Sequence, residues 1–317
     1  MHEFRESLLI LITVPVYAVV IGAELIFSYF NKKNLYSSKG IIQNIYLTSL
    51  NMGLDILMRG ACLLVLNYFY KFHVIDLAYA PLAYWAVLVI CQDFMFYWLH
   101  RIDHFCRLFW AVHVTHHSSE EFNLTVGFRS SVFQPLYRFI YFIPLAFLGF
   151  KGIDIMFIYS ATQIFGILIH TQTINKLGFL EYILVTPSHH RVHHGSNVRY
   201  LDKNMGMLLI VWDKLFGTFQ QEEATDPVKY GLTQNINSNN PVTIVFHEWQ
   251  QMFRDLSRKD CSFRDKLMYI FGPPGWSHDG SRKTSSQLRA AQANSVFTSV
   301  ETTTITTESD LKTGVEA

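Results

Sequence analysis

Ten of the fourteen histidines in this chain lie between residues 100 and 194, at spacings that suit metal binding. They form the patterns His-x3-His, His-x2-His-His, a single His, and His-His-x2-His-His. The ten are His100, His104, His113, His116, His117, His170, His189, His190, His193 and His194. Imidazole is a ligand of iron, copper, nickel and zinc. We therefore predict that all ten histidines bind metal. Because imidazole binds several metals, the histidines alone do not identify the metal.

The spacing also predicts how many ions are bound. Residues three and four apart share one face of a helix, so each group can converge on a common point. Neighbouring residues point about 100° apart, because a turn holds 3.6 residues, so an adjacent His-His pair can serve two different ions. Nine or ten histidines are too many for one ion, and two metals are predicted. The other four histidines are isolated in the sequence and are predicted not to be ligands: His2, His73, His247 and His278.

The elements that must position these histidines are strongly apolar. Half of the residues are hydrophobic, 16% are charged, and mean hydropathy is +0.17. A membrane span needs about 20 apolar residues. We predict an all-α integral membrane bundle of about four to five spans beneath a histidine-rich helical cap, with spans near 8–30, 44–70, 79–99, 132–150 and 153–171. In the second span, Asp55 and Arg59 are spaced i, i+4 and could pair.

The domain prediction divides the chain into two parts. Residues 1–280 are expected to form one membrane-embedded domain. The tail 281–317 is rich in Ser, Thr and Gln, and is predicted to be disordered. The first span is not predicted to be a signal peptide, because no small-residue cleavage site follows it and the N-terminus before it is not basic.

Charge bias predicts the orientation of the bundle. The 31–42 loop carries three lysines, and Arg101, Arg107 and Arg129 follow the third span. The positive-inside rule places these segments, and everything after residue 171, in the cytoplasm. All ten histidines then lie on one side of the membrane, so a multi-pass protein with a cytoplasmic site is expected.

Several other functions are disfavoured. A net charge of +1 gives no reason to expect a nucleic-acid partner. The four cysteines form no Cys-x2-Cys pair. A zinc hydrolase is a weaker alternative, because the chain lacks a His-Glu-x2-His motif and has too many histidines for a three-ligand zinc. A metal transporter is also weaker, because transport sites lie near the membrane midplane whereas these histidines follow span ends.

The strings TPSHHRVHHG, WDKLFGTF and FWAVHVTHHSSEEFNLTVGFRSS resemble the fatty acid hydroxylase / sterol desaturase superfamily, and within it most closely the alkylglycerol monooxygenases and their bacterial relatives. The resemblance covers roughly residues 84–275. It implies a membrane di-iron enzyme that uses O2 and a reductant to hydroxylate a lipid C–H bond, such as the ether-linked carbon of alkylglycerol-type lipids. A sterol or fatty acyl desaturase of the same superfamily is the alternative.

The resemblance also implies cofactors and partners. Nine of the ten histidines match the ligand positions directly. Some fatty acid hydroxylases have a further ligand where this chain has Ile174, so this ligand is either missing here or replaced by His189. The cofactors would be two Fe2+ ions, which zinc can replace in a purified protein, together with O2. The partners would be a membrane lipid substrate, the bilayer, and a pterin or an electron-transfer protein.

The electron donor is not determined by the resemblance. Phe105 and Gln172 stand where the alkylglycerol monooxygenases have Glu. Whether their tetrahydropterin dependence carries over is therefore left open, and a ferredoxin or a b-type cytochrome is the alternative donor.

Carboxylates are expected just outside the histidines, because they orient imidazole N–H groups and offset metal charge. Asp93 is the leading candidate, since it lies about two helical turns before His100. Asn123 and Asn197 follow their histidine groups and could bond a ligand or cap a helix. The remaining candidates are chosen by proximity alone: Asp103, Glu120, Glu121 and Asp202.

Overall fold

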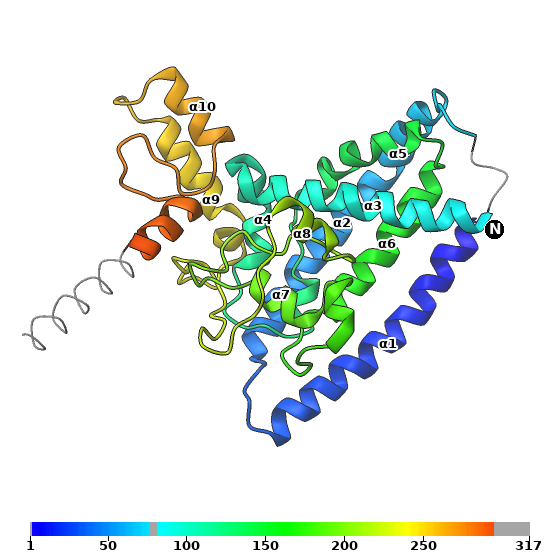
Figure 1. Cartoon of the computed structure of the whole chain (residues 1–317), viewed down its shortest axis with the longest axis horizontal. Coiled ribbons are helices and arrows are strands. Elements are labelled where there is room, and N and C mark those ends of the chain that lie inside the picture. Colours follow the sequence, from blue (N-terminus) through cyan, green and yellow to red (C-terminus); the bar gives the residue numbers. More distant parts are fainter. Residues whose placement is uncertain (1, 77–80, 295–317) are drawn as a thin grey trace, which may run out of the picture.

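The computed structural model describes residues 2–76 and 81–294 (Figure 1). Within these ranges all regular structure is helical, apart from two isolated β-bridges. The all-α prediction is therefore confirmed.

Three long helices form the apolar part of the bundle: α1 (His2–Phe30), α2 (Ser38–Tyr70) and α3 (Pro81–Phe105). Each has a stretch long and apolar enough to cross a bilayer. Their outer side chains are strongly exposed, for example Leu11 at 71% and Leu57 at 77%. Such extended apolar surfaces are unfavourable in water and favourable in lipid, and the chain is an integral membrane protein.

The fourth and fifth predicted spans differ from expectation. The segment 132–150 is not one helix but three short ones: η2 (Gln134–Leu136), η3 (Arg138–Phe142) and α5 (Ile143–Phe147). Pro135 and Pro144 lack the N–H that a continuous helix would need. Helix α6 (Gly152–Leu168) is continuous but has only 17 residues. Three described helices thus reach span length, rather than four or five; residues 79 and 80 of the predicted third span lie outside the described ranges.

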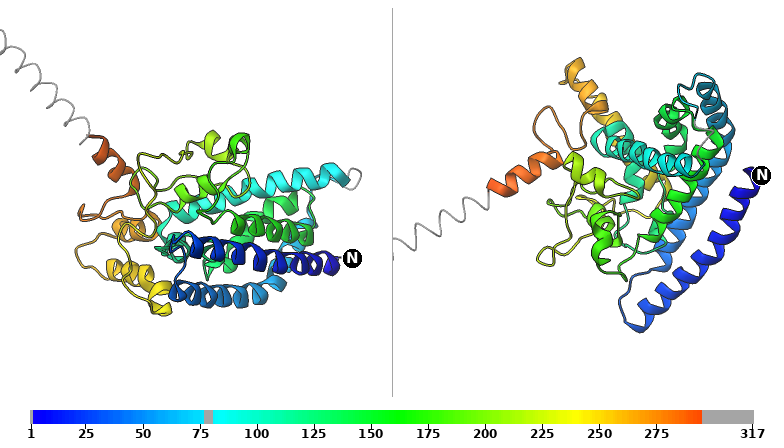
Figure 2. Two further views of the ribbon diagram at one scale, coloured as in Figure 1. Left: turned by 90° about the horizontal axis from the view of Figure 1, so that it is seen from below. Right: turned by 45° about the vertical axis from the view of Figure 1, so that its right-hand side comes forward.

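Helix α6 occupies the centre of the bundle and packs against α1, α2 and α3. The long helices run side by side (Figure 2), and α4, α7 and α9 lie at the end away from the N-terminus, whereas α5 lies on the side of the N-terminus (Figure 1). The core between α2, α3, α5 and α6 contains the fully buried Leu66, Leu88, Leu145 and Ile155.

The cap contains α4 (Arg107–His117), η1 (Val126–Phe128), η4 (Gly178–Tyr182), α7 (Pro187–His193), α8 (Val211–Phe216), α9 (Pro241–Leu256) and α10 (Phe263–Phe271). Helix α4 follows α3 almost directly, with extended backbone at Cys106 between them. The buried guanidinium of Arg107 then bonds Glu248 at 2.7 Å and Asp255 at 2.6 Å, which fixes α9 against α4.

Part of the tail that is predicted to be disordered is ordered. Residues 285–294 are helical. Arg289 donates to the carbonyl of Leu201 at 2.7 Å, and Arg282 pairs with Asp255 at 2.7 Å. These contacts hold the segment against the cap. The rest of that prediction, residues 295–317, lies outside the described residues.

A buried carboxylate joins the cap to the bundle. Asp93 of α3 accepts bonds from the backbone N–H groups of Leu208 and Leu209 at 2.8 and 3.0 Å, and from the indole of Trp212 at 2.9 Å. It is fully buried. Asp93 therefore holds the 208–212 segment on α3 and makes none of the histidine contacts predicted for it.

We expect Asp93→Ala to destabilise the protein by about 3 kcal/mol, because three buried donors lose a charged acceptor. Thermal unfolding of the purified protein in detergent measures this change. Glu223→Ala is the control: Glu223 pairs with Arg199, both largely exposed, and such pairs contribute little. Equal unfolding temperatures for the two variants would contradict this role.

Candidate metal centre

The structure brings nine of the ten predicted histidines into two buried groups. Within each group, one potential ligand atom per residue lies within 4.8 Å of every other. The first group (group A) is His100, His104, His113, His117 and His193. The second (group B) is His116, His170, His190 and His194. Each group has enough nitrogens to hold one metal ion.

Four segments supply these side chains. Helix α3 ends with His100 and His104, and α4 ends with the His-x2-His-His motif. His170 follows the last residue of α6. Helix α7 and its C-cap supply the remaining three: His190, His193 and His194. Most of the histidines thus lie at or just after the ends of helices, and these helix ends meet at the two groups.

Adjacent histidines divide between the groups, as the angle between neighbouring helix positions predicts. His117 belongs to group A and His116 to group B. His193 and His194 separate in the same way. The two groups lie side by side, because the ring centroids of His117 in group A and His194 in group B are 4.4 Å apart.

Most of these rings are held at Nδ1 by an acceptor outside the groups. Backbone carbonyls accept in four cases, at 2.7–2.9 Å: Met205 for His100, Arg129 for His116, Gly166 for His170 and Lys203 for His193. The hydroxyl of Ser131 lies 2.9 Å from Nδ1 of His113. With N–H at Nδ1, each of these rings leaves the Nε2 lone pair free to bind metal.

The Nε2 atoms point toward one another. Those of His100 and His113 are 3.1 Å apart, and those of His170 and His190 are 2.9 Å apart. Nε2 of His104, His193 and His194 is buried and has no hydrogen-bond partner among the described residues. Buried polar atoms without partners are costly, and metal ligation would satisfy them. The donor set therefore fits a metal centre.

Burial keeps the cap histidines neutral, which is the form that binds metal. It lowers the pKa of His113, His117, His190, His193 and His194 well below the usual value, and neighbouring imidazoles lower each further. Burial also lowers the pKa of His116, to about 4.

Two carboxylates lie just outside the histidines. Asp202 Oδ1 is 3.3 Å from Nδ1 of His104, and Asp103 Oδ2 is 3.8 Å from Nδ1 of His113. Asp103 is fully buried and accepts bonds from Gln134 and Tyr137. Neither group contains a carboxylate of its own. These two side chains are placed to offset part of the charge of bound metal.

The sequence favours three other residues beside the histidines: Asp93, Asn123 and Asn197. Asp93 binds backbone and indole N–H groups, as described above. Asn123 bonds the carbonyl of Leu35 at 2.7 Å and Thr125. Asn197 bonds Asp226 at 2.6 Å. All three fix loops rather than histidines, so they support the site only indirectly.

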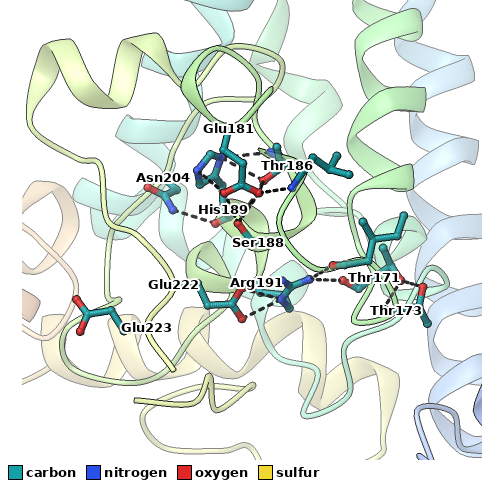
Figure 3. Close-up of polar contacts among 12 residues, drawn as sticks. Thr171, Thr173, Glu181, Thr186, Ser188, His189, Arg191, Asn204, Glu222 and Glu223 are labelled. Carbon is teal, nitrogen blue, oxygen red and sulfur yellow. Dashed lines mark hydrogen bonds and ion pairs between the residues drawn. The ribbon is translucent and has the colours of Figure 1, made fainter. Parts of the chain in front are cut away.

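His189 lies outside both groups, and the ligand role predicted for it is not carried further. Its Nδ1 is 3.3 Å from the backbone nitrogen of Thr186, and its Nε2 is 3.6 Å from Glu181 (Figure 3). It completes a capping box at the start of α7. Because neighbouring helix positions point about 100° apart, His189 points in a different direction from His190, toward Thr186 and Glu181.

Arg191 fixes α7 between its ligands. It bonds Glu222 through two nitrogens, and donates to the carbonyls of Thr171 at 3.0 Å and Ile174 at 2.7 Å (Figure 3). The segment that follows His170 is therefore tied to the helix that carries His190 and His193. The sequence carries no signal for this role of Arg191, because its partners, the Glu222 carboxylate and two backbone carbonyls, are distant in the chain.

Of the four histidines predicted not to be ligands, His73, His247 and His278 lie outside both groups, and the side chain of His2 is outside the part of the chain that the structure describes. Although His278 is isolated in the sequence, it has partners in the fold: Tyr269 OH lies at 2.8 Å and Cys261 Sγ at 3.5 Å. The nearby Asp260 completes a third potential ligand set, but Arg258 already binds both of its oxygens. That set is therefore a poor cation site.

A cavity of about 360 Å³ opens at the histidines. It is lined by members of both groups, including His100 and His116, and extends between α1, α2 and α6. Its walls are mainly apolar, with contributions from Tyr17, Phe96 and Ile167. A substrate reaching the metal centre by this route would come from the side of the apolar helices.

Comparisons with known proteins match the region that holds the site. The sequence profile of the fatty acid hydroxylase family matches residues 85–218. Alkylglycerol monooxygenase of Homo sapiens is 42% identical over 196 residues, covering 61% of this chain and 42% of that protein. The Xenopus tropicalis protein of that name is 37% identical over 238 residues, covering 73% and 52%. Ornithine lipid hydroxylase OlsE of Rhizobium tropici is 29% identical over 158 residues, covering 49% and 48%.

The chain spans about half the length of these curated relatives. No solved structure matches it.

Metal content tests the assignment of the two groups. We expect about two metal ions per chain in the wild type, and about one in His113→Ala or His190→Ala, since each variant removes a ligand from one group. His189→Ala is the matched control and should keep both ions. Mass spectrometry of the metal, normalised to protein, measures the ratio. Equal loss in His189→Ala would contradict the assignment.

Acid should destabilise the metal-free protein. In the unfolded chain His116 titrates near pH 6.5, whereas in the fold its pKa is about 4. The unfolded state therefore binds more protons between these values, and stability falls as pH falls through that window. We expect His116 alone to lower the free energy of unfolding by about 2 kcal/mol, which is less than its full pKa shift would give because its side chain is not fully buried. The other cap histidines should change the stability in the same direction. Denaturant unfolding at about pH 7 and pH 4 measures the difference, which should be smaller in His116→Gln.

Proposed function

We propose that the protein is a membrane-bound di-iron monooxygenase that hydroxylates a lipid C–H bond, since residues 85–218 match the sequence profile of the fatty acid hydroxylase family. The observation that carries the proposal is the pair of buried histidine groups at the head of an apolar cavity. The substrate class proposed is an ether lipid of the alkylglycerol type, on the strength of the relatives named alkylglycerol monooxygenase.

Two iron ions would be held by the nine histidines of groups A and B, and would supply the reduction of O2 and the oxidation of the C–H bond. Hydroxylation of one C–H bond consumes O2, two electrons and two protons, and releases one water. The electrons must come from an external donor: a tetrahydropterin, a ferredoxin or a b-type cytochrome.

The protein's own residues prepare the site for this chemistry. The acceptors at Nδ1 orient the imidazoles before metal binds, so little reorganisation accompanies binding. The apolar walls of the cavity exclude bulk water, which protects a strong oxidant from side reactions. Asp103 and Asp202 offset positive charge without occupying a ligand position.

The two positions that depart from the alkylglycerol monooxygenase pattern lie outside the ligand groups. Phe105 is 40% exposed and packs beside Arg101. Gln172 donates to the carbonyl of Phe122 at 2.7 Å. Neither contact favours one electron donor over another, so the proposal names no single electron donor.

We also propose that the site faces the cytoplasm. The lysine-bearing 31–42 loop lies at the histidine end of the bundle, where Asn123 bonds the carbonyl of Leu35. Basic loops favour the cytoplasmic side. Cysteine labelling of this loop and of the segment near Lys71, in sealed vesicles, checks the orientation.

Product mass tests the reaction. The purified protein, loaded with ferrous iron and supplied with O2, a reductant and an alkylglycerol, should yield a product heavier by one oxygen atom. A product lighter by two hydrogens would identify a desaturase instead. His117→Ala should lower the rate at least a hundredfold, because the ligand shell is broken. Chelation should do the same.

His189→Ala is the control for folding and handling, and should retain activity. Oxidation that survives both His117→Ala and chelation would exclude the metal mechanism.

A further inference from the structure

Helix α9 carries a stripe of apolar side chains on its outer side. Val242, Phe246, Trp249 and Phe253 follow one another at i, i+4, i+7 and i+11, and this spacing places them on one side of a helix. Val242 is 57% exposed, Phe246 39% and Phe253 60%. We call these four residues the apolar stripe. Large apolar side chains gathered on one exposed surface mark a site that another apolar surface covers.

The core of the protein already occupies a different side of α9. Ile244 packs with Leu47 of α2 in one apolar cluster. Glu248 and Asp255 both bond the buried guanidinium of Arg107 in α4. These contacts with two other helices fix the rotation of α9 about its own axis. The apolar stripe therefore stays on the outside and cannot turn toward the core.

A groove of about 440 Å³ runs beside the apolar stripe, between α4, η2 and α9. Its walls are aliphatic and aromatic side chains, among them Val112 of α4, Leu136 of η2 and Trp249. Leu136 is 46% exposed, so the groove opens to the outside. Nε1 of Trp249 has no hydrogen-bond partner among the described residues. A hydrocarbon chain suits walls of this kind, and the carbonyl of a lipid ester would accept a bond from the indole.

The apolar stripe continues the lipid-exposed surface of the bundle. The ring centroid of Phe246 lies 5.7 Å from that of Phe133, and Phe133 packs against the cluster that contains Leu47 of α2. On α2, Tyr46 is 41% exposed and Leu50 is 40% exposed. These side chains belong to the outward apolar surface of a helix that is long and apolar enough to cross a bilayer. The stripe thus begins where that surface ends.

The position of α9 along α2 matches the boundary of a bilayer. With 33 residues, α2 is about 50 Å long, whereas the hydrocarbon core of a bilayer is about 30 Å thick. One end of α2 must therefore reach the level of the lipid headgroups. Helix α9, in yellow, lies at the end of α2 that is nearer the cap (Figure 2, left).

We propose that the apolar stripe and the groove beside it dock onto the bilayer surface, with α9 lying along the headgroup boundary and a lipid hydrocarbon chain in the groove. Amphipathic helices that carry Trp and Phe on one side bind membranes in this way. Gln251 and Arg254, which are exposed on another side of α9, then face water and headgroups. The cap thus has a membrane contact of its own, in addition to the spanning helices. This inference concerns the cap and does not depend on the proposed reaction.

Photo-cross-linking to lipid tests the docking. The probe p-benzoylphenylalanine takes the place of Phe253, or of Gln251 as the matched control, in the full-length protein in liposomes of phosphatidylcholine. Two residues turn a helix by about 200°, so the two probes point to nearly opposite sides of α9. The same probe at Leu57 of α2, which is 77% exposed, is the positive control. Mass spectrometry of the irradiated protein measures the yield of lipid adduct.

We expect lipid adducts at positions 253 and 57, and about tenfold less adduct at position 251, because only the stripe side of α9 meets the hydrocarbon chains. Equal yields at 253 and 251 would overturn the proposal. So would an adduct of position 253 with protein, whether with a second copy or with another segment of the same chain. All three variants should unfold at the temperature of the wild type, which shows that the probe leaves the fold intact.

Fluorescence gives a second measurement that needs no unnatural residue. The emission that Trp249→Phe removes is the emission of Trp249. Lipids brominated near the headgroup end of their chains should quench that difference signal, because the indole lies at this depth. A difference signal that brominated lipid leaves unquenched would contradict the docking. Neither measurement uses O2 or a reductant, so a failure of the proposed oxidation would leave both results intact.

Discussion

The whole cap depends on one requirement: nine imidazoles must meet in a single buried volume while each presents the correct nitrogen. An imidazole that turns over, or changes tautomer, exchanges a lone pair for an N–H group and ceases to be a ligand. For six of the nine rings the structure meets the requirement with an acceptor at Nδ1, and four of these acceptors are main-chain carbonyls. Since a carbonyl position is set by the path of the backbone, the loops around the site act as part of the ligand shell.

This requirement explains why so much of the remaining polar structure serves to fix loops. Asp93 holds the 208–212 segment close to the carbonyl that receives His100, and Arg191 ties the segment after His170 to α7. Asp213 accepts from the backbone nitrogens of Met205 and Gly206, next to the same carbonyl. Gly127 lets η1 approach the end of α6, because a Cβ there would lie 2.9 Å from the backbone of Ile167. Each contact restrains a main-chain segment that orients a ring.

Sequence reasoning succeeded where the information lies in side-chain type and spacing. Periodicity alone placed His116 and His117 on different faces, and the structure puts them in different groups. Spacing gives no sign that His189 lies outside both groups, because the offset that it shares with other histidines says nothing about the capping role of the first turn of α7. Sequence reasoning also treated 132–150 as a span, since hydropathy does not register the two prolines. The carbonyl acceptors could not be predicted, because every residue has a carbonyl and only the fold selects among them.

The order of the ligands along the chain has a consequence for biosynthesis. Group A joins residues 100–117 to His193, and group B joins His116 to His194. Neither ligand set is complete until α7 has left the ribosome, long after the first three apolar helices could enter the bilayer. On the proposed function, metal capture would therefore be a late event in maturation. It would act on a bundle already in the membrane, and would link the two ends of a segment almost a hundred residues long.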